Sequence, residues 1–75
     1  MKVTFAPHAQ TTLNERGISF DKAIDTVRNP DRKEPTHRGR MKAVKRFEER
    51  EIHVIFIQVS KNDYEVITGY ESKLR

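Results

Sequence analysis

The segment EIHVIFIQVS, residues 51–60, decides the fold class of this chain. Its apolar residues form two alternating sets that point to opposite faces of an extended backbone: Ile52, Val54 and Phe56 in one, and Ile55, Ile57 and Val59 in the other. Apolar residues on both faces are typical of a central strand that is covered on both sides. We therefore predict that this segment forms the middle of a β-sheet.

The flanking segments predict further strands at residues 41–48 and 64–70, with turns at residues 49–50 and 61–63. The last strand is expected to place three residues on one face: Tyr64, Val66 and Tyr70. The polar tail at residues 71–75 is expected to be frayed. Residues 31–40 are polar and contain Pro35 and Gly39, so they are interpreted as a loop or a weak edge strand.

The N-terminal part predicts two short helices. In the first, Pro7 suits the opening turn, Ala9 and Leu13 share a face, and Gly17 ends the helix as a left-handed C-cap. Residues 2–5 before it are interpreted as a short edge strand or an ordered lead-in. The chain is long enough for one domain and no more.

The second helix has the clearest local pattern. Ser19 is a suitable N-cap, and Asn29-Pro30 ends the helix. Between them the apolar residues recur at helical spacing: Phe20, Ala23, Ile24 and Val27. Two N-terminal helices followed by a three- to four-stranded antiparallel sheet give an α+β fold.

Composition limits the classes of function. The chain lacks cysteine, which suits a reducing compartment, and we expect a cytoplasmic protein. Its longest apolar run, residues 54–57, is far too short to span a membrane. Residues 28–50 hold nine Lys or Arg against four acids, a local charge of +5. Such a basic belt suits a nucleic acid or an acidic protein partner, although a charge run is also typical of a solvated strand face.

The segment HAQTTLNERGIS, residues 8–19, resembles the opening motif of a small prokaryotic domain family of unknown function, in which His-Ala precedes an Arg-Met pair and then Glu-Arg-Gly-Ile-Ser. Later features of that family are matched by Asn29-Pro30, Lys45-Arg46 and residues 53–56 and 66–68. The resemblance covers nearly the whole chain. It implies a RelE-like or BrnT-like toxin fold, whose members are metal-independent ribonucleases held inactive by an antitoxin.

The resemblance also directs attention to particular residues. Cleavage of RNA without a metal needs a proton-transfer group and cations for the phosphate. For these roles the candidates are His8, Lys45, Arg46 and Thr68. Lys45 and Arg46 are adjacent, so on a strand they point to opposite faces and only one lines a given surface. One departure weighs against activity, because Thr12-Leu13 stands where the family has Arg-Met.

A second set of cations is expected to contact the RNA backbone. Arg38, Arg40 and Lys42 share one parity and form a basic stripe if the segment is extended. Arg16 is a further candidate for contact with RNA, and its structural alternative is a bond to helix-end carbonyls or to an acid such as Asp25. For His8, local packing is the alternative to proton transfer, and His53 is expected to be a buried, hydrogen-bonded histidine.

The spacing of the three histidines favours neither a metal site nor a cofactor. The hypotheses for function are therefore a toxin-like ribonuclease, a non-catalytic RNA- or protein-binding module, and a partner of an acidic chain such as an antitoxin. The sequence predicts no oligomeric state.

Overall fold

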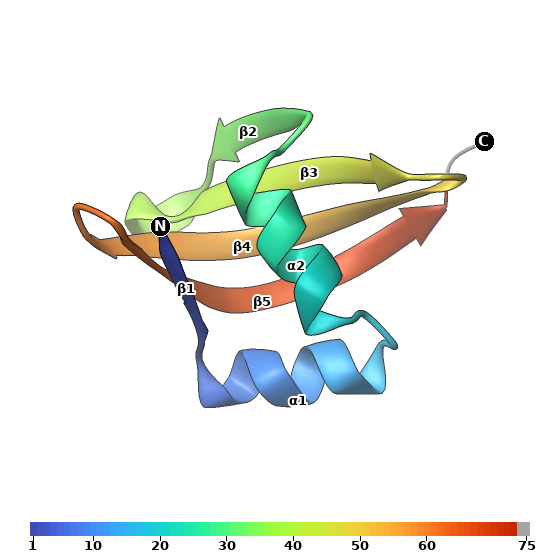
Figure 1. The fold of residues 1–75 in the computed structure, drawn as a ribbon, viewed down its shortest axis with the longest axis horizontal. Helices are drawn as coiled ribbons and strands as arrows, with labels where there is room; N and C mark the ends of the chain where they lie inside the picture. The colour runs from blue at the N-terminus through green and yellow to red at the C-terminus, as the bar shows by residue number, and fades with distance from the viewer. Residues whose placement is uncertain (74–75) are drawn as a thin grey trace.

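The computed structural model describes residues 1–73. Its elements, in chain order, are β1 (Lys2–Phe5), α1 (Pro7–Glu15), α2 (Phe20–Arg28), β2 (Arg32–Pro35), the 3₁₀ turn η1 (His37–Gly39), β3 (Met41–Phe47), β4 (Arg50–Ser60) and β5 (Asp63–Lys73). The strands form one sheet in the order β1-β5-β4-β3-β2 (Figure 1). β1 runs parallel to β5, and every other neighbouring pair is antiparallel.

The predicted α+β class and the two helices are confirmed, but the predicted sheet is wrong in two respects. It has five strands rather than three or four, and it is mixed because β1 precedes the helices and pairs in parallel with the last strand. Of the two interpretations of residues 2–5, an edge strand or an ordered lead-in, the structure confirms the strand; four residues carry too little alternation to decide between them. The partner of this strand lies about sixty residues away in the chain, so only the tertiary structure reveals the pairing.

Local signals position both helices as the sequence predicts. Pro7 opens α1, and Gly17 follows it with φ +70°, a conformation that glycine adopts without a steric penalty. The Ser19 side chain accepts a hydrogen bond from the backbone N–H of Lys22, 3.2 Å away, and so caps α2. The backbone N–H of Asn29 closes the other end on the Asp25 carbonyl.

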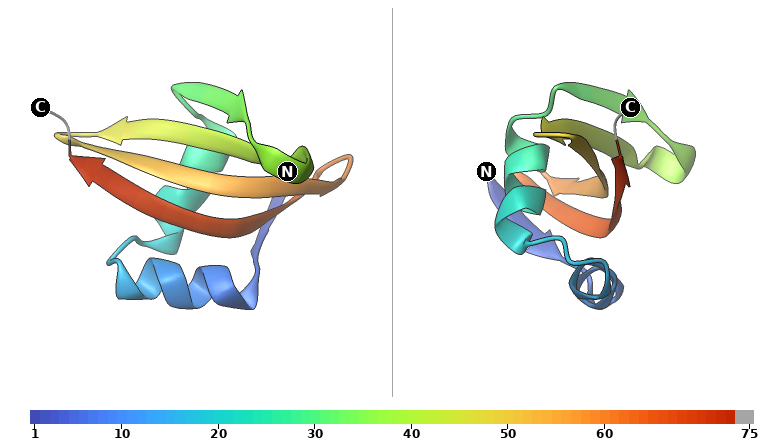
Figure 2. Two further views of the ribbon diagram at one scale, coloured as in Figure 1. Left: turned by 180° about the vertical axis from the view of Figure 1, so that it is seen from behind. Right: turned by 90° about the vertical axis from the view of Figure 1, so that its right-hand side faces the viewer.

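The core lies between the helices and one face of the sheet. α2 crosses that face over β3 and β4, while α1 runs along β5 (Figures 1 and 2). The fully buried apolar side chains include Leu13, Ala23, Ala43, Ile52, Val54 and Val66. Within residues 1–73 no helix covers the opposite face (Figure 2, left). β4 is therefore central, as predicted, but it is covered by helices on one side only.

A β-bulge in β5 reverses the side-chain directions expected for the end of that strand. Phe56 pairs with Val66 and Ile55 with Thr68, so Ile67 is an extra residue. After this bulge Tyr70 pairs with His53 and lies on the face opposite to Val66. The prediction that Tyr64, Val66 and Tyr70 share one face was therefore wrong, because strict alternation does not survive an inserted residue.

The bulge also places Gly69 on the helix side, directly beneath α1. A Cβ atom at Gly69 would lie 2.8 Å from Leu13 Cδ2 and 3.1 Å from the carbonyl oxygen of His53. Only a residue without a side chain allows α1 to approach β5 this closely.

The remaining boundaries differ from prediction by a few residues. The segment at 31–40 contains both a short edge strand, β2, and the turn η1. β5 extends to Lys73, because residues 71–73 pair with the start of β4. The predicted fraying is therefore wrong for residues 71–73, and residues 74 and 75 lie outside the described part of the chain. No helix within residues 1–73 is long and apolar enough to cross a membrane.

Candidate nucleic-acid interface

The face of the sheet opposite α2 gathers polar and charged side chains from four strands. We call it the open face. Cross-strand partners share a face, so the register assigns to it Arg32 and Glu34 of β2, Lys42, Val44 and Arg46 of β3, Glu51, His53, Ile55 and Ile57 of β4, and Glu65, Thr68, Tyr70 and Ser72 of β5.

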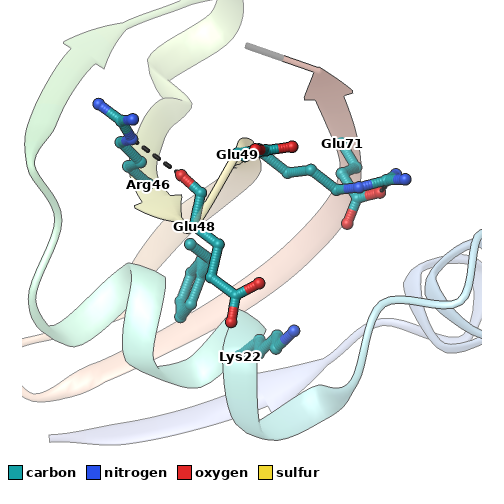
Figure 3. A pocket seen from close by; sticks show the side chains of 7 residues that line it. Lys22, Arg46, Glu48, Glu49 and Glu71 are labelled. Atoms are coloured by element: carbon teal, nitrogen blue, oxygen red, sulfur yellow. Dashed lines mark hydrogen bonds and ion pairs between the residues drawn. The ribbon is translucent and has the colours of Figure 1, made fainter.

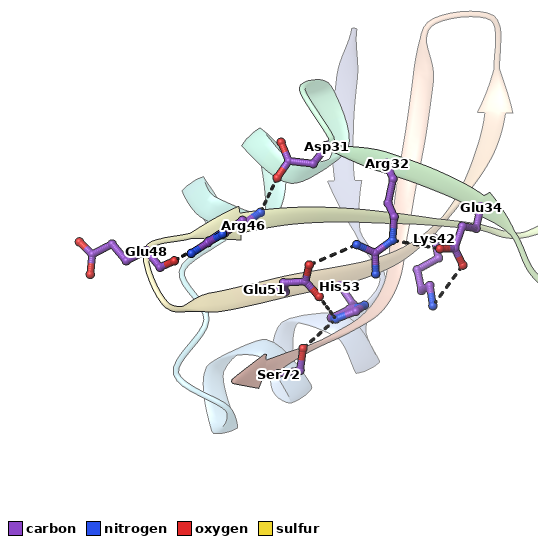
Figure 4. Close-up of polar contacts among 9 residues, drawn as sticks. All are labelled: Asp31, Arg32, Glu34, Lys42, Arg46, Glu48, Glu51, His53 and Ser72. Atoms are coloured by element: carbon purple, nitrogen blue, oxygen red, sulfur yellow. Dashed lines mark hydrogen bonds and ion pairs between the residues drawn. The ribbon is translucent and has the colours of Figure 1, made fainter. Parts of the chain in front are cut away.

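His53 lies at the centre of the open face and is 7% exposed. Its Nε2 lies 3.0 Å from Ser72 Oγ and 3.6 Å from Glu51 Oε1 (Figure 4). The ring stacks on Tyr70 with centroids 4.5 Å apart and planes 7° from parallel. Burial lowers the pKa of His53, while Glu51 opposes that shift. The expectation of a buried, hydrogen-bonded histidine is confirmed.

The tautomer of His53 follows from its contacts. Nδ1 is buried and has no hydrogen-bond partner within residues 1–73. An unpaired buried donor is costly, so the contacts assign the proton of the neutral ring to Nε2, which donates to Ser72 or Glu51. The ring is thus enclosed rather than presented to a substrate.

Two acids pair with two cations of the open face, Arg32 and Lys42. Arg32 Nε lies 3.1 Å from Glu34 Oε1, and Arg32 Nη1 lies 3.2 Å from Glu51 Oε2. Lys42 Nζ lies 3.5 Å from the second oxygen of Glu34 (Figure 4). The hydrogen bond from Arg32, aided by Lys42, lowers the pKa of Glu34, and the hydrogen bonds to Glu51 and Glu34 raise the pKa of Arg32. The basic belt of the sequence is therefore partly cancelled by neighbouring acids.

Lys45 and Arg46 point to opposite faces, as predicted. Lys45 lies on the helix side, where its Nζ donates to the Asn29 carbonyl at 2.8 Å and approaches Asp25 Oδ2 at 3.8 Å. It therefore ties the end of α2 to β3. Arg46 lies on the open face, is exposed, and donates through Nε to the Glu48 carbonyl at 2.9 Å. Of the pair, Arg46 is the residue that the open face presents.

His8 and Thr12 of α1 and the C-cap residue Arg16 recur at a spacing of four residues. His8 is exposed, and its Nε2 lies 3.3 Å from the hydroxyl of Thr12. Arg16 Nη1 donates to the Gly69 carbonyl at 2.6 Å. Arg16 therefore bonds a β5 carbonyl rather than the helix-end carbonyls or Asp25 that we expected. Thr68 stands on the open face of β5, the strand along which α1 runs.

The structure does not bring all the sequence candidates together. His8 and Thr68 come from adjacent elements, whereas Lys45 lies on the other face of the sheet and two strands from β5. The predicted stripe of Arg38, Arg40 and Lys42 is interrupted, because Arg38 has φ 60° inside the turn η1. Its side chain is exposed at the end of the sheet where β3 begins.

Sequence reasoning missed Arg32, Glu34 and Glu51, which form the ionic network of the open face. The sequence does not distinguish a loop from an edge strand in the segment that contains Arg32 and Glu34. Its two-residue spacing places both side chains on one face once β2 is recognised as a strand. That spacing was the available signal.

A pocket lies between α2 and the β3–β4 turn (Figure 3). Lys22, whose Nζ is 5.6 Å from the centre of the Phe47 ring, and Arg50, which pairs with Glu71, line it. Its cations and acids are equal in number. Within residues 1–73 no three His, Asp or Glu side chains are grouped closely enough to hold a metal ion.

No protein-family model matches the chain, and no curated protein matches it in sequence. The family resemblance of residues 8–19 therefore stays a prediction. Among solved structures, the crystal structure of the Brucella abortus ribonuclease toxin BrnT matches with a TM-score of 0.76 and 25% sequence identity. The match covers 97% of both chains. The chain is therefore similar to a ribonuclease toxin over almost its whole length and has a BrnT-like α+β fold.

Proposed function

We propose that this protein is a toxin-like RNA-binding protein that cleaves RNA without a metal ion. The observation that carries the proposal is the full-length structural match to a ribonuclease toxin. The open face adds a second support, since it offers a broad polar surface flanked by exposed cations at Arg38 and Arg46. Fold alone does not determine function, so the proposal depends on the residues that would perform the chemistry.

In the reaction the 2′-hydroxyl oxygen of RNA would attack the adjacent phosphorus while the bond from phosphorus to the 5′-oxygen breaks. The products would be a 2′,3′-cyclic phosphate and a free 5′-hydroxyl, so the proton lost by the nucleophile is balanced by the proton gained by the leaving oxygen. His8 is the proposed proton-transfer group, because it is exposed and an imidazole ring can both accept and donate a proton. Arg40 would hold the scissile phosphate, and the hydroxyl of Thr68 would donate a hydrogen bond to it. Arg46 lies six residues further along the same segment, too far to share that phosphate, so it would hold another phosphate of the same RNA. Arg38 and Lys42 would contact the RNA backbone further along. Lys45 and Arg16 would act by holding α2 and α1 in place.

The test is incubation of purified protein with a mixed RNA pool in EDTA. We expect fragments from the wild type and from His37→Ala, and intact RNA with His8→Ala. His37 is a matched control, since it is also an exposed histidine but lies in η1. Intact RNA with the wild type would refute cleavage under metal-free conditions. Equal cleavage by both variants would remove His8 from the mechanism.

The second candidate function is a non-catalytic RNA- or protein-binding module. It is favoured by the internal pairing of Arg32, Lys42 and Lys45, each of which contacts an acid of the same chain. The absence of the family Arg at Thr12 favours it as well. This alternative would be established if the protein binds RNA with a log affinity that falls linearly with log salt and yields no RNA fragments.

A toxin-like role also implies a partner and a compartment. We propose a small acidic protein as the antitoxin, since the net charge of this chain is +4, and the cytoplasm as the place where both meet RNA. Co-purification of the chain with the product of a neighbouring small acidic reading frame would test this proposal. If that product is present and does not bind, the toxin–antitoxin arrangement is refuted.

A further inference from the structure

We propose that Arg32 and Lys42 form a phosphate-binding site for RNA on the open face, and that Glu34 occupies this site in the free protein as an internal competitor. The inference rests on the proposed RNA-binding function. To that function it adds the group bound, which is a phosphate, the two cations that hold it, and the carboxylate that competes with it.

The geometry supports this assignment. Arg32 and Glu34 stand two residues apart on β2, and Glu34 is the cross-strand partner of Lys42 on β3. The two oxygens of the Glu34 carboxylate are divided between the cations, with Oε1 3.1 Å from Arg32 Nε and Oε2 3.5 Å from Lys42 Nζ. A phosphodiester also presents two anionic oxygens, so the same pair of cations can hold it in the same manner.

Accessibility supports the assignment as well. The side chains of Arg32 and Glu34 are 50% and 46% exposed, so a ligand reaches them from solvent without opening the fold. Ion pairs this exposed are weak, typically well below the strength of a buried pair. An RNA phosphate can therefore replace Glu34, whereas it could not displace a buried partner.

Glu51 keeps Arg32 in position during such an exchange. Its Oε2 lies 3.2 Å from Arg32 Nη1, a different nitrogen from the one that contacts Glu34. Glu51 is more enclosed than Glu34, at 20% exposure, and its other oxygen faces His53. The guanidinium thus remains anchored on one side while its Nε edge changes partner.

The experiment compares Glu34→Gln with Glu49→Gln, using a fluorescent single-stranded 2′-O-methyl RNA. This RNA has no free 2′-hydroxyl, so binding is measured without cleavage. Both substitutions raise the net charge by the same amount, but Glu49 lies in the β3–β4 turn and not on β2. The control therefore removes the general effect of charge on RNA affinity.

We expect Glu34→Gln to bind about twofold to fivefold more tightly than Glu49→Gln, the range expected when a competing contact made by exposed ion pairs is removed. The dependence of log affinity on log salt should also steepen by about 0.7, the value for one further phosphate on a single strand. Adding Arg32→Gln to Glu34→Gln should abolish both effects. Thermal melts of each variant verify that it is folded.

The results that would contradict this phosphate site differ from the results that would contradict the proposed RNA-binding function. Equal affinity of Glu34→Gln and Glu49→Gln, in a protein that binds RNA, would overturn the competitor role and leave the proposed function standing. A gain that persists after Arg32→Gln would overturn the assignment of the phosphate to Arg32. Absence of RNA binding in the wild type and in every variant would refute both this site and the proposed RNA-binding function.

Discussion

Gly69→Ala tests the close approach of α1 to β5. The new Cβ would lie 2.8 Å from Leu13 Cδ2 and 3.1 Å from the His53 carbonyl oxygen, both closer than ordinary van der Waals contact. Leu13 is fully buried in the core and the carbonyl belongs to the backbone, so a shift of either one disturbs the packing around it. Overpacking of this kind typically costs about 1–3 kcal/mol in the free energy of unfolding.

The expected result is a marked loss of thermal stability. For a domain of this size each kcal/mol lowers Tm by about 4–8 °C, so a cost of about 2 kcal/mol predicts a fall of roughly 8–16 °C. Alanine is favoured over glycine in a strand by about 0.5–1 kcal/mol, so the fall in Tm should lie towards the lower end of that range. Thermal unfolding followed by circular dichroism measures the change.

A double-mutant cycle identifies the cause. Leu13→Val removes the terminal methyl groups that meet the new Cβ, so Gly69→Ala should cost at least about 1 kcal/mol less in that background. Gly39→Ala is the control, because Gly39 has φ +73° and no atom near a built Cβ. Its cost should come from the backbone alone and should not depend on Leu13. An equal cost of Gly69→Ala in both backgrounds would refute the packing argument.

The remaining predictions concern the helix cap, the Lys45 contact and the buried histidine. Ser19→Ala removes the cap of α2 and should lower the free energy of unfolding by about 1 kcal/mol in urea titrations, whereas Ser19→Asp should retain it. Lys45→Met should cost about 1 kcal/mol by losing the hydrogen bond to the Asn29 carbonyl, yet change RNA affinity no more than Lys33→Met does; a selective loss of RNA binding would restore Lys45 to the site. Because burial lowers the pKa of His53 in the folded state, the unfolded chain binds more protons below its ordinary pKa of about 6.5. The free energy of unfolding of the wild type, measured relative to His53→Phe, should therefore be highest above that pH and should decrease as the pH falls towards the lowered pKa of folded His53. A difference between the two proteins that is independent of pH would contradict the burial of a neutral His53.

For much of the candidate site, the sequence predicts which types of residue take part but not which of them lie together. The separation of Lys45 from Arg46 follows from the two-residue period of a strand, and the structure confirms it. Which of them meets the helices does not follow, because that depends on the face that α2 covers. The pairing of Arg32 and Lys42 with Glu34 was equally hidden, since β2 acquires a face only through its register with β3.

The sequence by itself determined the local elements of this protein. Ser19, Gly17 and Asn29-Pro30 define helix ends through caps and backbone preferences that act within a few residues. The alternation in residues 51–60 defines the central strand in the same local way. The tertiary structure decided the rest: the parallel pairing of β1 with β5, the bulge at Ile67, and the face that holds Tyr70 and Thr68. These features depend on contacts between segments far apart in the chain, such as the contact of Leu13 with the backbone at Gly69, which no local pattern encodes.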